Sequence, residues 1–259
     1  MTTKANSAVP HVGSPIASLS AAQMAEVDRL AIEEYGITLL QMMEQAGSHL
    51  AEVVRLELGG ELVGRTVVVA VGPGNNGGGG LVAARHLVNR GAAVRVVLSR
   101  PALRTTEASR HQLATLIAMG VSCCVATFDL SDVELEDALA GAEMVVDAVL
   151  GYRLHEAPRG EEERLIGFIA RSRRPVVSLD LPSGMDPDSG EAAGVVVNAA
   201  ATLTLALPKV GIWSPVGRTR IGRLYLGDLG LPLALYTAIG VDPGRPFSGG
   251  RLVIVDQRE

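Results

Sequence analysis

Hydrophobic residues recur at helical spacing near the start of the chain. Between residues 19 and 35 the apolar positions fall three or four residues apart, and Ser20 precedes them as a helix N-cap. The same spacing returns between residues 39 and 58, after Gly36 interrupts the first pattern. The residues that define the two apolar faces are Met24, Val27, Leu30, Ala31, Leu40, Met43, Ala46, Leu50 and Val54. The chain is therefore expected to begin with two helices.

Beyond residue 60 the pattern changes to short apolar runs that alternate with helix-like segments. The run over residues 66–71 is continuous and β-branched, as in strands that a parallel sheet buries on both faces. Strands are predicted at 66–71, 94–98, 121–126, 144–150, 175–179, 201–206 and 223–226, and helices at 81–90, 107–119, 132–139 and 161–171. Because right-handed crossovers place helices on both faces of such a sheet, this order predicts a Rossmann-like three-layer α/β/α sandwich, mostly parallel, with two extra N-terminal helices. We expect a flexible tail at residues 1–17 and a single domain over residues 18–259.

The composition argues against several classes of function and location. The 259 residues carry a formal charge of −5, and only 3% of them are aromatic. Binding to a phosphate backbone depends on positive charge, and stacking on bases depends on aromatic side chains, so nucleic-acid binding is not expected. No apolar segment is long enough to predict a membrane span, and the N-terminus lacks the apolar core of a signal peptide. Cys123 and Cys124 are neighbours in a predicted strand and point to opposite faces, so we expect two buried free thiols and a cytoplasmic location.

Three polar loops directly follow predicted strands, and a parallel sheet brings such loops to one edge. The first loop reads GPGNNGGGG over residues 72–80. Glycines let backbone N–H groups approach a ligand, and the start of the following helix offers partial positive charge. This outlines a phosphate cradle, in which the amides of Asn75 and Asn76 can donate to a ligand or offer oxygen to a cation.

Carboxylates and a hydroxyl mark the other two loops. In VVDAVLGYRL, Asp147 ends an apolar strand, where it either faces a cation, donor or water or caps a turn. In SLDLPSGMDPDSG, Asp180 follows the strand and Ser183 supplies a hydroxyl, and both are alternatively simple turn residues. Lys209, in LPKVG after a further strand, either neutralises a phosphate or contacts the cradle, or it is a solvated surface residue.

Together these segments resemble the NAD(P)H-hydrate epimerase family, the YjeF N-terminal domain. The resemblance runs from about residue 18 to residue 235 through SAAQMAEVDRLAIEEYGI, QMMEQAG, GPGNNGG, LVAARHL, VDAVLG, SLDLPSGMDPDSG, TLTLALPKVGI and GRLYLGDLGLP. It implies an isomerase that interconverts the R and S hydrates of NADH and NADPH (NADHX and NADPHX), so that a separate dehydratase can recover the cofactor. It also implies a homodimer.

The resemblance implies roles for individual residues. Asp180 is expected to contact the reacting ring and to transfer a proton to and from the substrate hydroxyl. Asn76, Asp147 and Ser183 are expected to hold a potassium ion (K+), a hard cation that takes oxygen ligands. The substrate is expected to contact Asn75, Asn76, Gly77, Gly78, Gly79, Gly151, Tyr152, Arg153, Leu154, His155, Glu156, Ala157 and Asp180.

The chain departs from the family pattern in two loops. The family's first loop reads GNNGGDG, whereas Gly79 stands here in place of the Asp. The second loop often carries a small triplet, whereas Tyr152 and Arg153 are bulky. A hydrogen bond that involves a charged group contributes about 1.5–3 kcal/mol. If the Asp makes such a bond in the family, its absence predicts weak activity, an altered ligand or a compensating residue from elsewhere in the chain.

Two alternatives to an epimerase stay open. The first is a non-catalytic nucleotide-binding or scaffold module on the same fold, which the loss of the Asp at position 79 favours. The second is a Rossmann dehydrogenase, which has an acidic residue about 20 residues after its glycine loop. Ser99 and Arg100 stand at that point of this chain, and neither is acidic.

Overall fold

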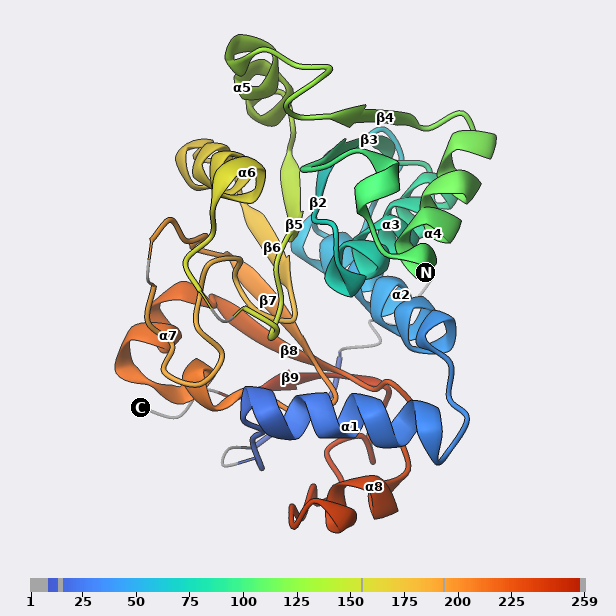
Figure 1. The fold of residues 1–259 in the computed structure, drawn as a ribbon, viewed down its shortest axis with the longest axis vertical. Helices are drawn as coiled ribbons and strands as arrows, with labels where there is room; N and C mark the ends of the chain where they lie inside the picture. The colour runs from blue at the N-terminus through green and yellow to red at the C-terminus, as the bar shows by residue number, and fades with distance from the viewer. Residues whose placement is uncertain (1–8, 14–15, 155, 193, 257–259) are drawn as a thin grey trace, which may run out of the picture.

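The computed structural model describes residues 9–13, 16–154, 156–192 and 194–256, which form one sheet of nine strands with helices on both faces (Figure 1). The strands are β1 (His11–Val12), β2 (Thr66–Val71), β3 (Ala93–Leu98), β4 (Ser122–Val125), β5 (Met144–Ala148), β6 (Val176–Leu179), β7 (Ala201–Leu205), β8 (Arg223–Gly227) and β9 (Leu252–Val255). They lie in the order β1-β9-β8-β7-β6-β5-β2-β3-β4, and among them only β8 and β9 pair antiparallel. The predicted fold class, a mostly parallel Rossmann-like sandwich, is confirmed.

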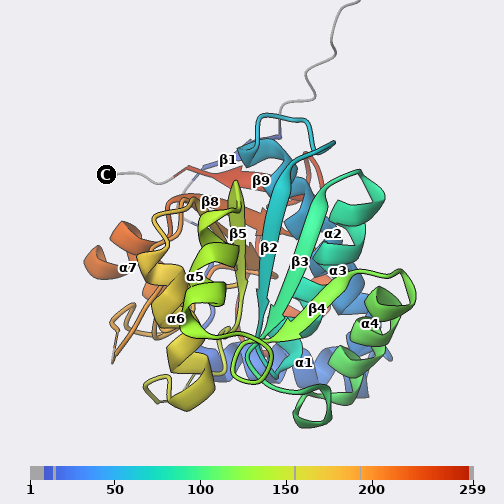
Figure 2. The same ribbon diagram turned by 90° about the horizontal axis from the view of Figure 1, so that it is seen from above.

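The helices form layers on the two faces of the sheet (Figure 2). They are α1 (Ala21–Glu33), α2 (Leu39–Glu57), α3 (Asn75–Asn89), α4 (Glu107–Ala118), α5 (Asp132–Ala140), α6 (Gly160–Arg171), α7 (Pro215–Arg220) and α8 (Leu233–Ala238), with short 3-10 turns at Ala102–Arg104 and Val210–Trp213. Apolar residues of α2, α3 and α4 share one core with the sheet, and those of α5 and α6 share the core on the opposite face. Helix α1 packs with α8 in a separate apolar cluster at the strand ends (Figure 1).

Sequence periodicity located most of these elements within two or three residues. Ser20 caps α1 as predicted, because its side chain accepts a hydrogen bond from the Gln23 backbone N–H while the Gln23 side chain accepts from the Ser20 N–H. Leu40 was expected on the buried face of α2, but it is 39% exposed, so this assignment is wrong. The helix instead buries Met42 and Val53, which the wider apolar stripe of a core-facing helix includes.

Both ends of the chain contribute strands that the sequence did not predict. His11 and Val12 pair with Ile254 and Val255, so the prediction of a flexible tail over residues 1–17 is wrong for these two residues. Residues 1–8, 14 and 15 of that predicted tail lie outside the described residues. Strand β9 pairs antiparallel with β8, and this long-range pairing has no local sequence signal beyond a four-residue apolar run.

The glycine-rich segment is mostly helix and not a loop, which corrects the sequence prediction of a helix starting at residue 81. Helix α3 begins at Asn75, directly after Gly74 as N-cap. Glycine is a poor helix former, so propensity alone argues against this start. Close packing against α2 outweighs the propensity: a Cβ on Gly47 of α2 would lie 2.7 Å from the carbonyl oxygen of Gly79.

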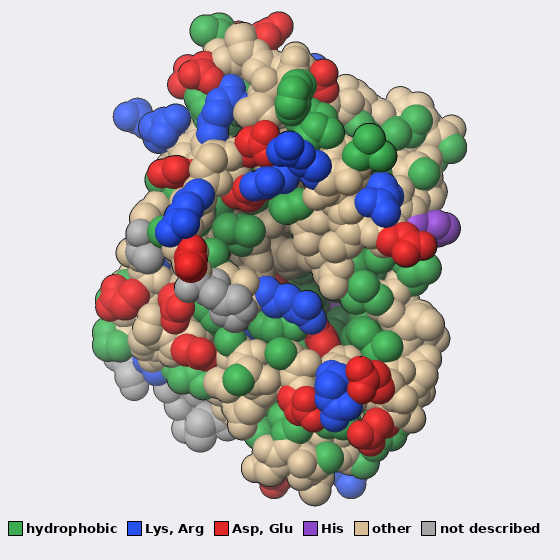
Figure 3. Space-filling model, in the orientation of Figure 1, with side chains coloured by type: hydrophobic (Ala, Val, Ile, Leu, Met, Phe, Trp, Pro, Cys, Tyr) green, Lys and Arg blue, Asp and Glu red, His purple; other side chains and the backbone are tan. Residues whose placement is uncertain are grey.

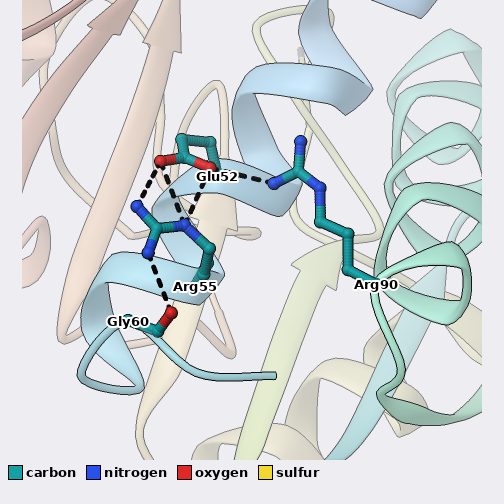
Figure 4. A network of polar contacts seen from close by, with 4 residues as sticks. All are labelled: Glu52, Arg55, Gly60 and Arg90. Atoms are coloured by element: carbon teal, nitrogen blue, oxygen red, sulfur yellow. Dashed lines mark hydrogen bonds and ion pairs between the residues drawn. The ribbon is translucent and has the colours of Figure 1, made fainter. Parts of the chain in front are cut away.

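A polar network ties the other ends of α2 and α3 together (Figure 4). Glu52 accepts a hydrogen bond of 2.6 Å from Arg55 on its own helix and one of 2.9 Å from Arg90 at the end of α3. Arg55 also donates to the carbonyl oxygen of Gly60, 2.9 Å away, in the turn that leads to β2. Glycine contacts at one end and this network at the other hold the two helices in register.

Candidate active site

A cavity of about 240 Å³ lies between the carboxyl ends of the central strands and helices α1 and α2. Figure 3 shows this face of the molecule hollowed near its centre, with apolar side chains around the hollow. The strand ends, the segments that follow them and the first turns of α3 contribute Pro73, Gly74, Asn75, Asn76, Gly79, Val149, Leu150, Gly151, Tyr152, Arg153, Leu154, Leu179, Asp180 and Leu205. The helices and the segment after β8 contribute Met24, Asp28, Leu39, Met42, Met43, Ala46 and Leu229. Parallel sheets place ligands at this edge.

Asp180 is the buried acid that lines this cavity, at the residue after β6. Its φ is +70°, a left-handed conformation that costs a non-glycine residue free energy and that Asp tolerates better than most. Its backbone N–H donates to the carbonyl oxygen of Leu203, 2.7 Å away, and its Oδ2 accepts from the backbone N–H of Tyr152, 2.9 Å away. The conformation turns the carboxylate to the loop that follows β5.

Lys209 forms an ion pair with Oδ1 of Asp180. The Lys209 side chain is fully buried, and its ammonium also donates to the carbonyl oxygens of Leu205, at 3.0 Å, and Leu207, at 3.4 Å. The sequence interpretations of Lys209 as a phosphate contact and as a solvated surface residue are therefore wrong. No local sequence pattern indicates this pair, because the two residues are far apart in the chain and the pairing of β6 with β7 brings their strand ends together.

Asp147 lies behind the cavity wall and not in its lining. It is fully buried, and Ser183 donates to it twice, from its backbone N–H at 2.8 Å and from its hydroxyl at 2.5 Å. The Ser178 hydroxyl donates at 2.8 Å and the Val149 N–H at 3.3 Å. Burial raises the pKa of the Asp147 carboxyl, although these hydrogen bonds favour its charged form.

Ser183 joins the second and third loops. Its hydroxyl accepts from the backbone N–H of Leu150, 2.8 Å away, while it donates to Asp147. The next residue along, Gly151, leaves space for two polar groups: a Cβ there would lie 3.0 Å from Oδ2 of Asp180 and 3.2 Å from Oδ1 of Asn76. The structure thus brings the amide, both acids and the hydroxyl to one edge of the sheet.

The first residues of α3 divide between the cavity and the packing. Asn75, Asn76 and Gly79 line the cavity, and Oδ1 of Asn75 is buried without a hydrogen-bond partner among the described residues. Asn76 donates from Nδ2 to the Leu179 carbonyl oxygen, 3.3 Å away. Gly77 and Gly78 lie outside the lining and allow close packing, because a Cβ would lie 2.1 Å from the Gly72 carbonyl oxygen at the first and 2.6 Å from Met43 Cε at the second.

The second loop is attached to α1 through a residue that sequence reasoning missed. The Tyr152 hydroxyl donates to Asp28, 2.5 Å away, and Arg153 contacts the same carboxylate at 3.3 Å. Burial, and then the Asp28 charge, raise the pKa of the Tyr152 hydroxyl. Gly151 and Leu154 also line the cavity, whereas Glu156 pairs with Arg159 at the surface. Ala157 is outside the lining as well, and His155 lies outside the described residues.

The two cysteines lie on opposite faces of β4, as predicted. Cys123 packs against the core on the α3 side and Cys124 against the core on the α5 side, and both thiols are free. They are half-buried and not fully buried as expected, because β4 is the edge strand of the sheet. Among the described helices, none combines the length and apolar character needed to cross a bilayer.

The fold and the cavity together define a Rossmann-like α/β protein with a buried acid at the ligand-binding edge of its sheet. Comparison with known sequences identifies the family: the chain matches the YjeF-related protein N-terminus over residues 39–211 and belongs to that family. It is 42% identical to the NAD(P)H-hydrate epimerase of Dehalogenimonas lykanthroporepellens over 243 residues, which are 93% of this chain and 94% of that protein. The family resemblance noted from the sequence motifs is confirmed.

Two further relatives show how the chain compares in extent and structure. The bifunctional NAD(P)H-hydrate repair enzyme Nnr of Moorella thermoacetica is 38% identical over 218 residues, and the match covers 84% of this chain but only 41% of that enzyme. The crystal structure of the yeast protein ynu0 superposes with a TM-score of 0.79 at 27% identity, covering 92% of this chain and 99% of that one. The chain thus spans nearly the whole length of the first relative and of the yeast protein, and less than half of the bifunctional enzyme.

Proposed function

We propose that this protein is an NAD(P)H-hydrate epimerase, which interconverts the R and S hydrates of NADH and NADPH. The observation that carries the proposal is Asp180, a buried carboxylate in the lining of a mostly apolar cavity at the ligand-binding edge of the sheet. The names of the relatives at 42% and 37% identity support the same activity. The cavity holds the damaged nicotinamide ring, and the strand-end glycines leave room for the nucleotide.

Epimerisation of the hydrate needs one base, which takes a proton from the substrate and later gives it back. In the hydrate, a hydroxyl is attached to a ring carbon next to the ring nitrogen. Asp180 takes the hydroxyl proton, and the O–H electron pair left on oxygen forms the second bond of a carbonyl. The ring C–N bond breaks at the same carbon, and its electron pair moves to nitrogen, which receives the proton. Rotation and closure onto the opposite face of the carbonyl reverse these steps and give the other epimer, with no atom gained or lost.

The residues around Asp147 fit the potassium ion implied by the family. Asp147 is a fully buried carboxylate whose partners are hydroxyls and backbone N–H groups, and no cationic side chain of the described residues pairs with it. An amide oxygen, a hydroxyl and a carboxylate are the hard oxygen ligands of an alkali cation. Asn76, Asp147 and Ser183 would hold the ion, which would supply the missing positive charge and fix the loops around the cavity.

The experiment that tests the function is direct. Purified R hydrate of NADPH is incubated with the protein, and the S hydrate is followed by chromatography against the spontaneous rate. We expect rapid equilibration by the wild type and a loss of about 100-fold or more in Asp180→Asn, the range in which positioned bases contribute. A wild-type rate equal to the spontaneous one would refute the proposal.

Gly79 favours one alternative, a nucleotide-binding module without catalysis. Its lack of a carboxylate leaves the cavity wall apolar at this point, beside Leu179. Thermal stabilisation by NADP+ without any epimerisation would identify such a module, since a ligand that binds only the folded state raises the unfolding temperature.

The partners and location are part of the same proposal. Two relatives are named bifunctional NAD(P)H-hydrate repair enzymes, and this chain matches less than half of their length. We expect a separate dehydratase to consume the product here. A homodimer and the reducing cytoplasm, in which free thiols such as Cys123 and Cys124 persist, complete the proposal.

A further inference from the structure

We infer that Lys209 is a positioning residue that holds Asp180 as an oriented carboxylate on the cavity wall. The inference rests on the proposed function, because it gives Asp180 the role of the base. Lys209 is fully buried and Asp180 is 4% exposed, and their ion pair lies directly behind the cavity lining. Lysines are almost never fully buried unless they are paired, so this residue has a specific task.

Three oxygen atoms of the protein surround the Lys209 ammonium. They are Oδ1 of Asp180 and the carbonyl oxygens of Leu205 and Leu207. A lysine has three N–H donors and no acceptor, so none remains for a substrate. Lys209 therefore acts through Asp180 and does not touch the reacting atoms.

The same contacts stabilise two strained positions. Asp180 follows β6 with a φ of +70°, and Ala206 follows the neighbouring strand β7 with a φ of +62°. Left-handed conformations at non-glycine residues persist only where the surrounding structure enforces them. Lys209 contacts the first residue itself and the carbonyl oxygens on either side of the second.

Lysine is rare in this chain, which singles out Lys209 among its basic residues. The sequence contains 21 arginines and only two lysines, Lys4 and Lys209. In the part of the chain that the structure describes, every other basic position with a permanent charge is arginine. An arginine presents five donors in a rigid planar fork, whereas this buried site offers three acceptors around a point charge.

The ion pair with Lys209 occupies Oδ1 of Asp180 and leaves Oδ2 to accept the proton of the substrate hydroxyl. Oδ1 is held by the ammonium, and Oδ2 accepts one hydrogen bond from the Tyr152 N–H beside Gly151. Each carboxylate oxygen has two lone pairs, so Oδ2 retains one for a substrate hydroxyl.

The experiment is a double-mutant cycle in kcat and KM for epimerisation of the R hydrate of NADPH. We compare the wild type, Lys209→Met, Asp180→Asn and the double variant Lys209→Met/Asp180→Asn. Lys209→Met is expected to lower kcat by about 30-fold or more while KM changes by less than about threefold, because positioned general bases contribute about 10²–10⁴-fold. In the Asp180→Asn background the same change is expected to leave kcat within about threefold.

Three more variants keep the test decisive. Breaking a buried ion pair is strongly destabilising, so Lys209→Gln, which retains N–H donors without the charge, serves if Lys209→Met does not fold. Lys209→Arg is expected to fail to restore kcat. Thr204→Val is the matched control, because Thr204 is equally buried in β7 and its hydroxyl has no hydrogen-bond partner among the described residues, and its kcat should stay within about twofold.

The outcomes separate the inference from the function. If the wild type epimerises and both Lys209→Met and Lys209→Gln keep kcat within threefold, the inference is overturned and the epimerase stands. The same holds if Lys209→Met costs the same factor with and without Asp180. Wild-type kcat in Lys209→Arg would overturn the requirement for lysine. A wild type without epimerase activity overturns the proposed function and the role of Lys209 with it.

Discussion

Replacing Gly47 with alanine tests whether close helix packing positions the candidate site. An added Cβ would lie 2.4 Å from Cβ of Val82 and 2.7 Å from the carbonyl oxygen of Gly79. Non-bonded carbon atoms pack at about 3.5–4.0 Å, so α2 and α3 would have to separate by about 1 Å. Because one of the two atoms is backbone oxygen, side-chain rotation cannot relieve the contact.

The magnitude follows from two opposing effects. Overpacking of this kind costs up to about 3 kcal/mol, and replacing glycine within a helix gains about 1 kcal/mol. The net loss of about 2 kcal/mol corresponds to a fall in Tm of about 4–8 °C for a domain of this size. A shift of about 1 Å at Asn75 and Asn76 would lower kcat/KM by about 100-fold.

Differential scanning calorimetry measures the change in Tm, with Gly79→Ala as matched control, and the epimerase assay measures the change in kcat/KM. At Gly79 the added Cβ would meet only Leu179 Cδ2 within 3 Å, at 2.8 Å, and that side chain can rotate. The control is expected to keep its Tm within about 2 °C, because the gain in helix propensity offsets the rotation. A Gly47→Ala protein that melts and turns over like the wild type would show that the glycine contact does not set the helix spacing.

Three further predictions concern the loop, the buried acid and the thiols. Tyr152→Phe removes the hydrogen bond to Asp28 and should raise KM about tenfold with kcat within threefold, since such a bond contributes about 1.5–3 kcal/mol; an unchanged KM argues against this attachment of the loop. Burial raises the pKa of Asp147, so its contribution to stability is largest below about pH 4 and is lost as the pH rises through the folded-state pKa. Potassium at five times its Kd should then raise Tm by about 2–4 °C at pH 8 relative to lithium, and by less at pH 5; equal shifts at both pH values would count against a cation beside Asp147. Burial raises the pKa of Cys123 to about 11, so at pH 8 iodoacetamide should alkylate it about 100-fold more slowly in the folded than in the urea-unfolded chain, and equal rates would contradict that burial.

The central strands were predictable because a strand that is buried on both faces appears in the sequence as a continuous apolar run. Thr66–Val71 is an uninterrupted β-branched run, and the structure places a strand over the same residues. The first turns of α3 were not predictable, because Gly47 and Val82, which make the glycines necessary, are contacts across two helices. Strand β9 and the Lys209 ion pair were missed for the same reason: each depends on the order of strands in the sheet, which no short segment encodes.

The loss of an acid at position 79 and the retention of Asp180 affect different steps. A side chain at position 79 would point at Leu179 and Ala46, on the apolar wall of the cavity, whereas Asp180 faces Gly151 on the wall formed by the strand-end loops. The proposed base and its lysine are therefore in place without an acid at position 79. An interaction made equally with substrate and transition state affects KM and not kcat. We therefore expect the glycine at position 79 to affect how tightly the hydrate is held, and Asp180 with Lys209 to determine kcat.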